Sequence, residues 1–249
     1  EGAVNTIVEG LQKLEYRGYD SAGIAVALPN GRIEAIKQVG YVSGLVQSLG
    51  ERFSKATVGI GHTRWATHGA LTEANAHPHW DCTGTLAVVH NGIVENFVNL
   101  RRLLKEGVHK LVSDTDSEVI VHLLEDQINQ GMTLEKGVMR LGKLLQGSNV
   151  VLVLSTRGDP SIVAFKQGHA GGLAIGYGEN QIFISSDIPA MPPVARNGVF
   201  LENGEMVVVK ESDQGPSDSF YNSLVGKKIE KPVLEFVNPS YGAVTGQYQ

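Results

Sequence analysis

The chain has 249 residues, a formal net charge of −5 and a composition of 42% hydrophobic and 19% charged residues, which is typical of a globular protein with one large or two small domains. The negative charge argues against nucleic-acid or membrane-surface binding, and no apolar run is long enough to cross a bilayer. The single cysteine, Cys82, excludes an internal disulfide, and no signal peptide is recognisable, so we expect a cytoplasmic protein.

The N-terminal third predicts a helix followed by strands. Apolar residues recur at helical spacing over 4–14. The period then changes, and residues 23–28 and 32–39 read as two strands joined by a Pro-Asn-Gly turn at 29–31. These strands are expected to form an antiparallel hairpin. A further buried strand is predicted at 57–60.

The middle of the chain predicts helices after a buried strand at 86–89. Residues 96–106 are amphipathic, and residues 133–145 form another helical pattern. Between them, residues 115–118 (TDSE) fit a capping box in front of an apolar stripe that continues to residue 128.

The second half of the chain is punctuated by turns. These are 157–160, 178–180 and 202–204, joining strands 150–154 to 162–165, 173–175 to 182–184, and 199–201 to 206–209. Hairpins on either side of a helical middle predict antiparallel sheets covered by helices, and not a doubly wound parallel fold. Beyond residue 237 the pattern fades, which predicts a tail or linker.

A polar run, GHTRWATHG at residues 61–69, follows the strand at 57–60 and is predicted to be a loop that could hold substrate. The planar guanidinium of Arg64 can bind a carboxylate through two hydrogen bonds, although a structural ion pair is the commoner role of one arginine. Its neighbours Trp65, Thr67 and His68 favour the ligand-binding interpretation.

Several histidines gather in this part of the sequence, namely His62, His68, His77 and His79. They could suggest a metal site, but they have no neighbouring thiolate and no acidic residues at zinc-site spacing. We therefore predict no metal site, and a polar structural role for each histidine is at least as common as catalysis.

Two further positions could contribute chemistry. Asn91 and Gly92 follow a buried strand, and their amide and backbone N–H groups could stabilise an oxyanion, although a plain Asn-Gly turn explains them more simply. Asp116 opens a helix, where a carboxylate complements the helix dipole or could hold a substrate ammonium. If these residues converge, Arg64 and Asp116 could bind the two charged groups of a free amino acid while Asn91 and Gly92 polarise its side-chain carbonyl.

Five motifs together resemble the glutaminase domain of the glucosamine-6-phosphate synthases, also called isomerizing glutamine–fructose-6-phosphate aminotransferases, which are class II glutamine amidotransferases. The motifs are LEYRGYDSAG at 14–23, GHTRWATHG at 61–69, NAHP at 75–78, HNGIVEN at 90–96 and SDTDSE at 113–118. The first two differ from the corresponding runs of amidophosphoribosyltransferases. The resemblance therefore favours the sugar aminotransferases.

The resemblance implies an α+β fold, the αββα sandwich of the N-terminal-nucleophile hydrolases, with two antiparallel sheets between helical layers over residues 1–237 and a tail or linker at 238–249. It implies glutamine as substrate and no cofactor. In this family an N-terminal cysteine attacks the carboxamide and releases ammonia. The ammonia converts fructose 6-phosphate to glucosamine 6-phosphate in a sugar-isomerase domain of the same full-length protein, which is expected to be a homodimer.

The resemblance also assigns roles to individual residues. Asn91 and Gly92 would form the oxyanion hole, while Arg64 would bind the α-carboxylate and Asp116 the α-ammonium of glutamine. The remaining assignments place Trp65, Thr67, His68 and His77 around the glutamine loop, and Arg17 as a support for the nucleophile end.

The sequence departs from the family pattern in places. The family begins Cys-Gly-Ile on a first strand, whereas Glu1 already lies in the lead-in to the first helix, so we expect a chain that lacks the nucleophile strand and glutaminase turnover. Cys82, in a predicted turn, is expected to be a structural thiol. Residues 168–172 (GHAGG) replace a usual Gly-Ser-Pro. The alternatives are a non-catalytic glutamine-binding module and the amidotransferase half of another class II enzyme.

Overall fold

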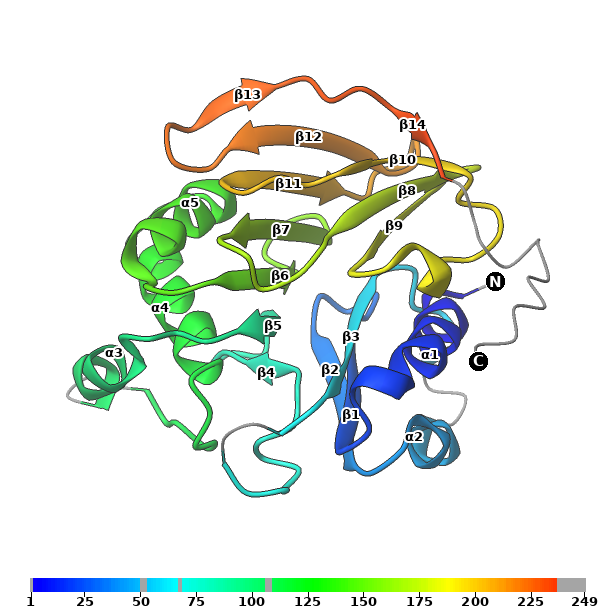
Figure 1. The fold of residues 1–249 in the computed structure, drawn as a ribbon. Helices are drawn as coiled ribbons and strands as arrows, with labels where there is room; N and C mark the ends of the chain where they lie inside the picture. Colours follow the sequence, from blue (N-terminus) through cyan, green and yellow to red (C-terminus); the bar gives the residue numbers. More distant parts are fainter. Residues whose placement is uncertain (1, 50–52, 67–68, 106–108, 237–249) are drawn as a thin grey trace, which may run out of the picture.

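Four layers, ordered helix–sheet–sheet–helix, are visible in the computed structural model, which describes residues 2–49, 53–66, 69–105 and 109–236 (Figure 1). The helices are α1 (Ala3–Leu14), α2 (Val42–Leu49), α3 (Phe97–Lys105), α4 (Glu118–Asn129) and α5 (Leu134–Leu144), with short 3₁₀ turns η1 (Glu15–Arg17) and η3 (Ile188–Ala190). No helix in these ranges has the length and apolar character that a bilayer crossing requires. The predicted tail at 238–249 lies outside the described residues.

All strand pairs of the described chain are antiparallel. The seven-stranded sheet has the order β13-β12-β11-β7-β6-β5-β4, the four-stranded sheet β14-β10-β8-β9 and the three-stranded sheet β2-β1-β3. Their bounds are β1 Ser21–Ala27, β2 Ile33–Val39, β3 Gly59–Arg64, β4 His79–Trp80, β5 Leu86–Gly92, β6 Asn149–Ser155, β7 Ser161–Gln167, β8 Ala174–Gly178, β9 Gln181–Ser185, β10 Asn197–Phe200, β11 Glu205–Lys210, β12 Ser217–Asn222, β13 Lys227–Ile229 and β14 Leu234–Glu235.

The alternation of side chains along β5 explains the layering. Leu86 and Val88 point to the side covered by α3, α4 and α5, whereas Ala87 and Val89 pack against Ile60 of the three-stranded sheet. The outer face of the three-stranded sheet is covered by α1 and α2, and the four-stranded sheet packs on another part of the seven-stranded sheet. The predicted αββα sandwich is thus confirmed, with its second sheet layer made of two separate sheets.

Most of the elements predicted from the sequence are confirmed. The turns at 29–31, 157–160 and 178–180 join β1 to β2, β6 to β7 and β8 to β9. The predicted turn at 202–204 lies between β10 and β11, but the expected hairpin is wrong. β10 pairs with β8 and β14, while β11 pairs with β7 and β12. A turn signal reverses the chain locally but does not select the sheet that each strand joins.

Two local predictions need correction. Residues 61–64 of the polar run belong to β3 and are not part of a loop. The capping box at 115–118 does not form, because Ser117 is the N-cap of α4 and its side chain makes no capping hydrogen bond. The carboxylate of Glu118 instead accepts hydrogen bonds from the backbone N–H groups of Val112 (2.8 Å) and Ser113 (2.9 Å). It therefore fixes the chain segment that leads into the helix.

Candidate functional site

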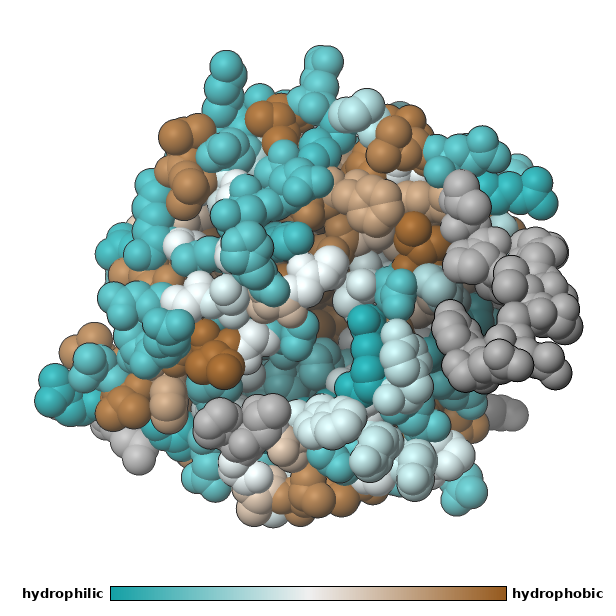
Figure 2. All heavy atoms as spheres, viewed as in Figure 1, coloured by the Kyte–Doolittle hydropathy of each residue, from teal (hydrophilic) through white to brown (hydrophobic). Residues whose placement is uncertain are grey.

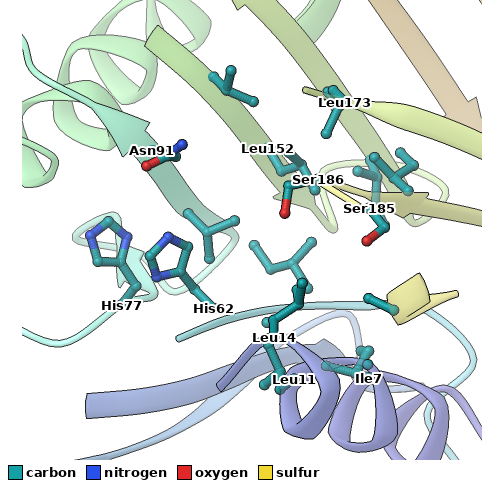
Figure 3. A pocket seen from close by; sticks show the side chains of 18 of the residues that line it. Ile7, Leu11, Leu14, His62, His77, Asn91, Leu152, Leu173, Ser185 and Ser186 are labelled. Carbon is teal, nitrogen blue, oxygen red and sulfur yellow. The ribbon is translucent and has the colours of Figure 1, made fainter. Parts of the chain in front are cut away.

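A cleft of about 930 Å³ opens between the sheets beside α1. Figure 2 shows this face of the molecule with hydrophobic and hydrophilic residues interspersed around a central recess. The labelled lining in Figure 3 consists of Ile7, Leu11, Leu14, His62, His77, Asn91, Leu152, Leu173, Ser185 and Ser186. Aliphatic side chains from α1 form one wall, and imidazole and amide groups gather on the side away from Ser185 and Ser186. The cleft therefore has an apolar region and a polar region.

The sequence of β3 determines which of its residues face the other sheet. A Cβ atom on Gly61 would lie 2.5 Å from Cγ2 of Ile7 and 3.0 Å from Cδ1 of Leu11, so glycine lets α1 pack directly on this strand. The intervening residues Ile60, His62 and Arg64 lie on the opposite face, toward β5 and β6. The polar side chains at the end of β3 therefore lie in the space between the sheets.

Arg64 ends β3 and is only 8% exposed. Burial lowers the pKa of its guanidinium, while the carboxylates of Asp116 and Asp20 oppose that shift. An arginine keeps its charge in such surroundings because its ordinary pKa is above 12. The cleft thus contains a fixed positive charge with carboxylates close to it.

Asp116 lies just before α4 and lines the same cleft as Arg64. Its Oδ2 accepts a hydrogen bond from the backbone N–H of Val94 at 2.8 Å, and its Oδ1 accepts one from Ser117 Oγ at 3.4 Å. These contacts hold the carboxylate in place from two directions. Residues 52 positions apart in sequence therefore bring opposite charges to one site, as the sequence analysis assumed.

Asn91 and Gly92 form the end of β5 and are paired with Val150 and Asn149 of β6, so the interpretation as a plain Asn-Gly turn is wrong. The side-chain amide of Asn91 donates a hydrogen bond to the carbonyl oxygen of Ala170 at 2.5 Å. Gly92 has a φ of 143°, and a Cβ atom there would lie 2.1 Å from the carbonyl oxygen of Ser148. This position accepts only glycine because both its conformation and its surroundings exclude a side chain.

Beside these residues lies a cluster of buried histidines. The rings of His62 and His77 are stacked with centroids 4.4 Å apart, and the ring of His79 meets His77 edge-on at 4.9 Å. Burial lowers the pKa of both His62 and His79 to about 3, and it also lowers the pKa of His77 and His90. The Nδ1 atom of His77 accepts a hydrogen bond from the backbone N–H of His90 at 3.2 Å. The four imidazoles are therefore neutral at physiological pH.

His90 was not predicted as a site residue. Its Nδ1 lies 2.9 Å from Ser117 Oγ and its Nε2 lies 2.9 Å from Asn149 Oδ1, so it connects β5 to the start of α4 and to β6. A histidine within the apolar strand 86–92 is a buried polar group that must find partners, and this was the sequence signal for its role.

Asn75 explains why the NAHP motif matters to the site. Its Oδ1 accepts a hydrogen bond from the backbone N–H of Asp114 at 2.8 Å, and its Nδ2 donates one to the carbonyl of Ala70 at 3.0 Å. The side chain thereby connects the segment after the polar run to the segment that carries Asp116. His77, two residues later, is buried against Gly23 of β1. A side chain at position 23 would collide with the carbonyl oxygen of His77.

The remaining predicted site residues lie at the edge of the cleft or outside the described residues. Trp65 lines the cleft but is 57% exposed, and its ring lies 5.6 Å from that of Tyr19. Arg17 also lines the cleft, and its Nη2 donates a hydrogen bond to Ser186 Oγ at 2.6 Å. Thr67 and His68 lie outside the described residues.

Comparison with known sequences finds relatives of one kind. The sequence model of a family described as glutamine amidotransferase domain matches residues 49–142. Three curated relatives named isomerizing glutamine–fructose-6-phosphate aminotransferase are 44% identical over 199 residues (Aeropyrum pernix), 46% over 230 (Pyrococcus horikoshii) and 39% over 233 (Thermus thermophilus). These alignments cover 80%, 92% and 94% of this chain but 32%, 38% and 37% of the relatives. The chain thus spans about a third of the length of these relatives.

Comparison with solved structures extends the similarity to the fold. A glutamine phosphoribosylpyrophosphate amidotransferase from B. subtilis, complexed with ADP and GMP, matches with a TM-score of 0.68 and 26% identity over 88% of this chain and 46% of that one. A structure described as the allosteric regulatory enzyme of purine biosynthesis has a TM-score of 0.69 at 24% identity, over 86% of this chain and 45% of the other, and shows the shared fold. Residues 49–142 therefore belong to the glutamine amidotransferase domain family, and the chain has the αββα architecture of the N-terminal-nucleophile hydrolases.

Proposed function

We propose that this chain is the glutaminase part of an isomerizing glutamine–fructose-6-phosphate aminotransferase, in which glutamine hydrolysis supplies ammonia for the synthesis of glucosamine 6-phosphate. The observation that carries the proposal is that Arg64 and Asp116 bring opposite charges to one cleft, beside Asn91 and Gly92. A free amino acid carries one negative and one positive group on the same carbon, and the cleft has a complementary partner for each.

Each side chain has a defined part in this proposal. Arg64 binds the α-carboxylate through its two parallel N–H groups, and Asp116 accepts the α-ammonium. The amide nitrogen of Asn91 carries two hydrogens, one of which is directed to Ala170, so the other can donate to the carbonyl oxygen of the glutamine side chain. The backbone N–H of Gly92 is the second donor for the oxyanion. Trp65, Thr67, His68 and His77 order the glutamine loop, and Arg17 supports the end that holds the nucleophile.

The nucleophile that this reaction class requires is not among the 249 residues. The single cysteine, Cys82, is not among the residues lining the cleft, and it has no free α-amine to act as a base. We therefore propose that this chain alone binds glutamine without turning it over. β3 and β9 are terminal strands of their sheets and both border the cleft, so a further strand could pair there and present a nucleophile.

The proposal extends to the longer protein. Relatives more than twice the length of this chain carry fructose 6-phosphate in their names, which supports a sugar-isomerase domain that uses the ammonia. We propose a homodimer in the cytoplasm, with no cofactor needed for glutamine hydrolysis.

One alternative is a glutamine-binding module without catalysis. The other is the amidotransferase half of a different class II enzyme, which the likeness to a phosphoribosylpyrophosphate amidotransferase keeps open. If the full-length protein releases ammonia from glutamine, it is not a non-catalytic binding module. If that release depends on fructose 6-phosphate, the protein is not a different class II enzyme.

Calorimetric titration of the purified chain with glutamine tests the binding site. Arg64→Ala removes a bidentate charge-assisted contact, and we expect it to weaken binding by about 2–5 kcal/mol. Arg32→Ala, at an exposed arginine near the β1–β2 turn, is the matched control and should leave binding unchanged. Unaltered affinity in a folded Arg64→Ala variant would remove Arg64 from the site. Rapid ammonia release by the 249-residue chain would overturn the proposed lack of turnover.

A further inference from the structure

We propose that Cys82, His109, His122 and Glu125 form a zinc site separate from the cleft. Cys82 lies in the turn between β4 and β5, His109 follows α3, and His122 and Glu125 lie on α4. Each offers one ligand atom, and these four atoms all lie within 4.8 Å of one another. The four residues are absent from the cleft lining, so the site does not depend on the proposed glutaminase function.

The distances between these atoms fit a tetrahedral ion. Cys82 Sγ lies 3.5 Å from His109 Nδ1 and 3.8 Å from His122 Nδ1. Glu125 Oε2 lies 3.1 Å from each of the same two nitrogens. A zinc ion with bonds of about 2.0–2.3 Å separates its ligand atoms by roughly 3.3–3.8 Å. The observed spacings therefore need only small adjustments to surround zinc.

The set of donors also suits zinc in charge and type. A thiolate and a carboxylate neutralise a divalent ion, and two neutral imidazoles complete four coordination with the nitrogen, sulfur and oxygen ligands that zinc prefers. The side chains of His109, His122 and Glu125 are 7%, 2% and 4% exposed. Water therefore provides little compensation for these polar groups.

A carboxylate also lies on the far side of each histidine ring. The Nε2 atom of His109 lies 2.8 Å from Asp126 Oδ1, and the Nε2 atom of His122 lies 3.9 Å from Glu118 Oε1. Both rings direct Nδ1 toward the cluster, and the Nε2 atom of His109 is within hydrogen-bond distance of its acid, whereas the Nε2 atom of His122 is too far from Glu118 for a hydrogen bond. Zinc-bound histidines commonly have such a carboxylate partner, which fixes the ring orientation and the tautomer.

Hydrogen bonds alone account for this cluster less well. Each histidine Nδ1 is close to both Cys82 Sγ and Glu125 Oε2, but one N–H group can be directed well at only one of them. Glu125 Oε2 additionally accepts a bond from the backbone N–H of Cys82 at 3.2 Å. An ion at the centre would bind all four atoms at once, whereas without a metal the thiol makes only long contacts with the two histidines.

The site is closed, because four protein ligands leave no position for a substrate, and its role is therefore structural. It would connect the turn before β5 and the segment after α3 to the middle of α4. The histidines near the polar run, which were weighed as metal ligands from the sequence, are not the histidines of this cluster. The ligands used here lie 27, 13 and 3 residues apart, which matches no compact zinc motif.

Metal analysis of the protein, produced without a polyhistidine tag, tests the proposal. After zinc addition and dialysis, we expect about one zinc ion per chain. Cys82 is the only cysteine, so alkylation reports on it alone, and zinc should slow the reaction by about tenfold or more, with a chelator restoring it. Cobalt in place of zinc should give a thiolate-to-cobalt absorption band.

Two variants and a control complete the test. Cys82→Ser, at an exposed position, should fold, lose the cobalt band and lose most of the bound zinc. Glu125→Gln should also weaken zinc retention, whereas His169→Ala, at an exposed histidine, should not. Zinc-independent alkylation of Cys82, or equal zinc retention by wild type and a folded Cys82→Ser variant, overturns the site and leaves a hydrogen-bonded cluster.

Discussion

The side-chain amide of Asn91 and the carbonyl oxygen of Ala170 are joined by a hydrogen bond of 2.5 Å. Ala170 lies in residues 168–172, the segment for which the sequence predicts a departure from the pattern of the glucosamine-6-phosphate synthases. A Cβ atom on Gly171 would lie 3.1 Å from the same amide nitrogen. The variant segment thus orients the residue that we propose as an oxyanion donor.

Replacing Asn91 tests that role. In the full-length protein, we expect Asn91→Ala to lower kcat for ammonia release from glutamine by about 10²–10³-fold, because one oxyanion donor is lost. KM should change little, since the donor acts mainly in the transition state. Steady-state ammonia assays measure both constants.

The matched control loosens the same segment without touching the amide. Asn203 Oδ1 accepts a hydrogen bond from the backbone N–H of Gly168 at 2.7 Å, so Asn203→Ala removes a support of residues 168–172. Its effect on kcat should be much smaller. Equal losses in the two variants would mean that Asn91 acts through the position of the loop.

Gly92→Ala should destabilise the fold. A residue with a side chain is strained at a φ of 143°, and the new Cβ would lie 2.1 Å from the carbonyl oxygen of Ser148, which belongs to the backbone and cannot rotate away. We expect a loss in the free energy of unfolding of about 3 kcal/mol or more. Urea denaturation followed by circular dichroism measures it.

Gly84→Ala separates the two causes of that loss. Gly84 also has a positive φ, 70°, but no atom lies within 4 Å of a Cβ built there. Its cost should be limited to backbone strain, about 1 kcal/mol. If the two alanine variants were equally stable, the contact with Ser148 would be unimportant.

Acid should destabilise the protein through its buried histidines. Burial lowers the pKa of His62 in the folded state to about 3, below the ordinary 6.5. Below pH 6.5, His62 is therefore protonated in the unfolded chain, whereas in the folded chain it stays neutral until about pH 3. The stabilising contribution is complete above pH 6.5 and is lost as the pH falls toward 3, by up to about 1.4 kcal/mol per pH unit.

Unfolding free energies measured between pH 6.5 and 5 test this effect, because most carboxylates titrate below that range. His62→Gln should flatten the decline with pH, although it also changes stability at neutral pH. His169→Gln, at an exposed position, controls for the loss of one histidine. An identical pH slope in wild type and His62→Gln would contradict the assigned cause.

Local signals made most of the fold predictable. The turn at 29–31 and the helical period over 4–14 each depend on residues close in sequence, and the structure contains the corresponding hairpin and helix. The partners of β10 and β11 were not predictable, because sheet membership depends on contacts between distant segments. Residues 61–64 were predicted to be a loop because they are polar. In the structure they form the end of β3, where polar side chains face the cleft.

The candidate site was predictable in part. Arg64 and Asp116 were assumed to converge, and the structure places both in one cleft. Their roles toward glutamine remain predictions. The stacked rings of His62 and His77 could not be derived from spacing, because β3 and the segment at 75–78 meet only in the folded chain.

The two charged groups of the cleft come from different sheet layers. Arg64 is attached to the three-stranded sheet, while Asp116 is held by Val94, just beyond β5 of the seven-stranded sheet. A ligand bound by both residues, as we propose for glutamine, would connect the two sheet layers through the middle of the sandwich. Part of its binding free energy would then oppose separation of the two layers. Ligand binding would therefore stabilise the whole molecule against unfolding, and not only one loop.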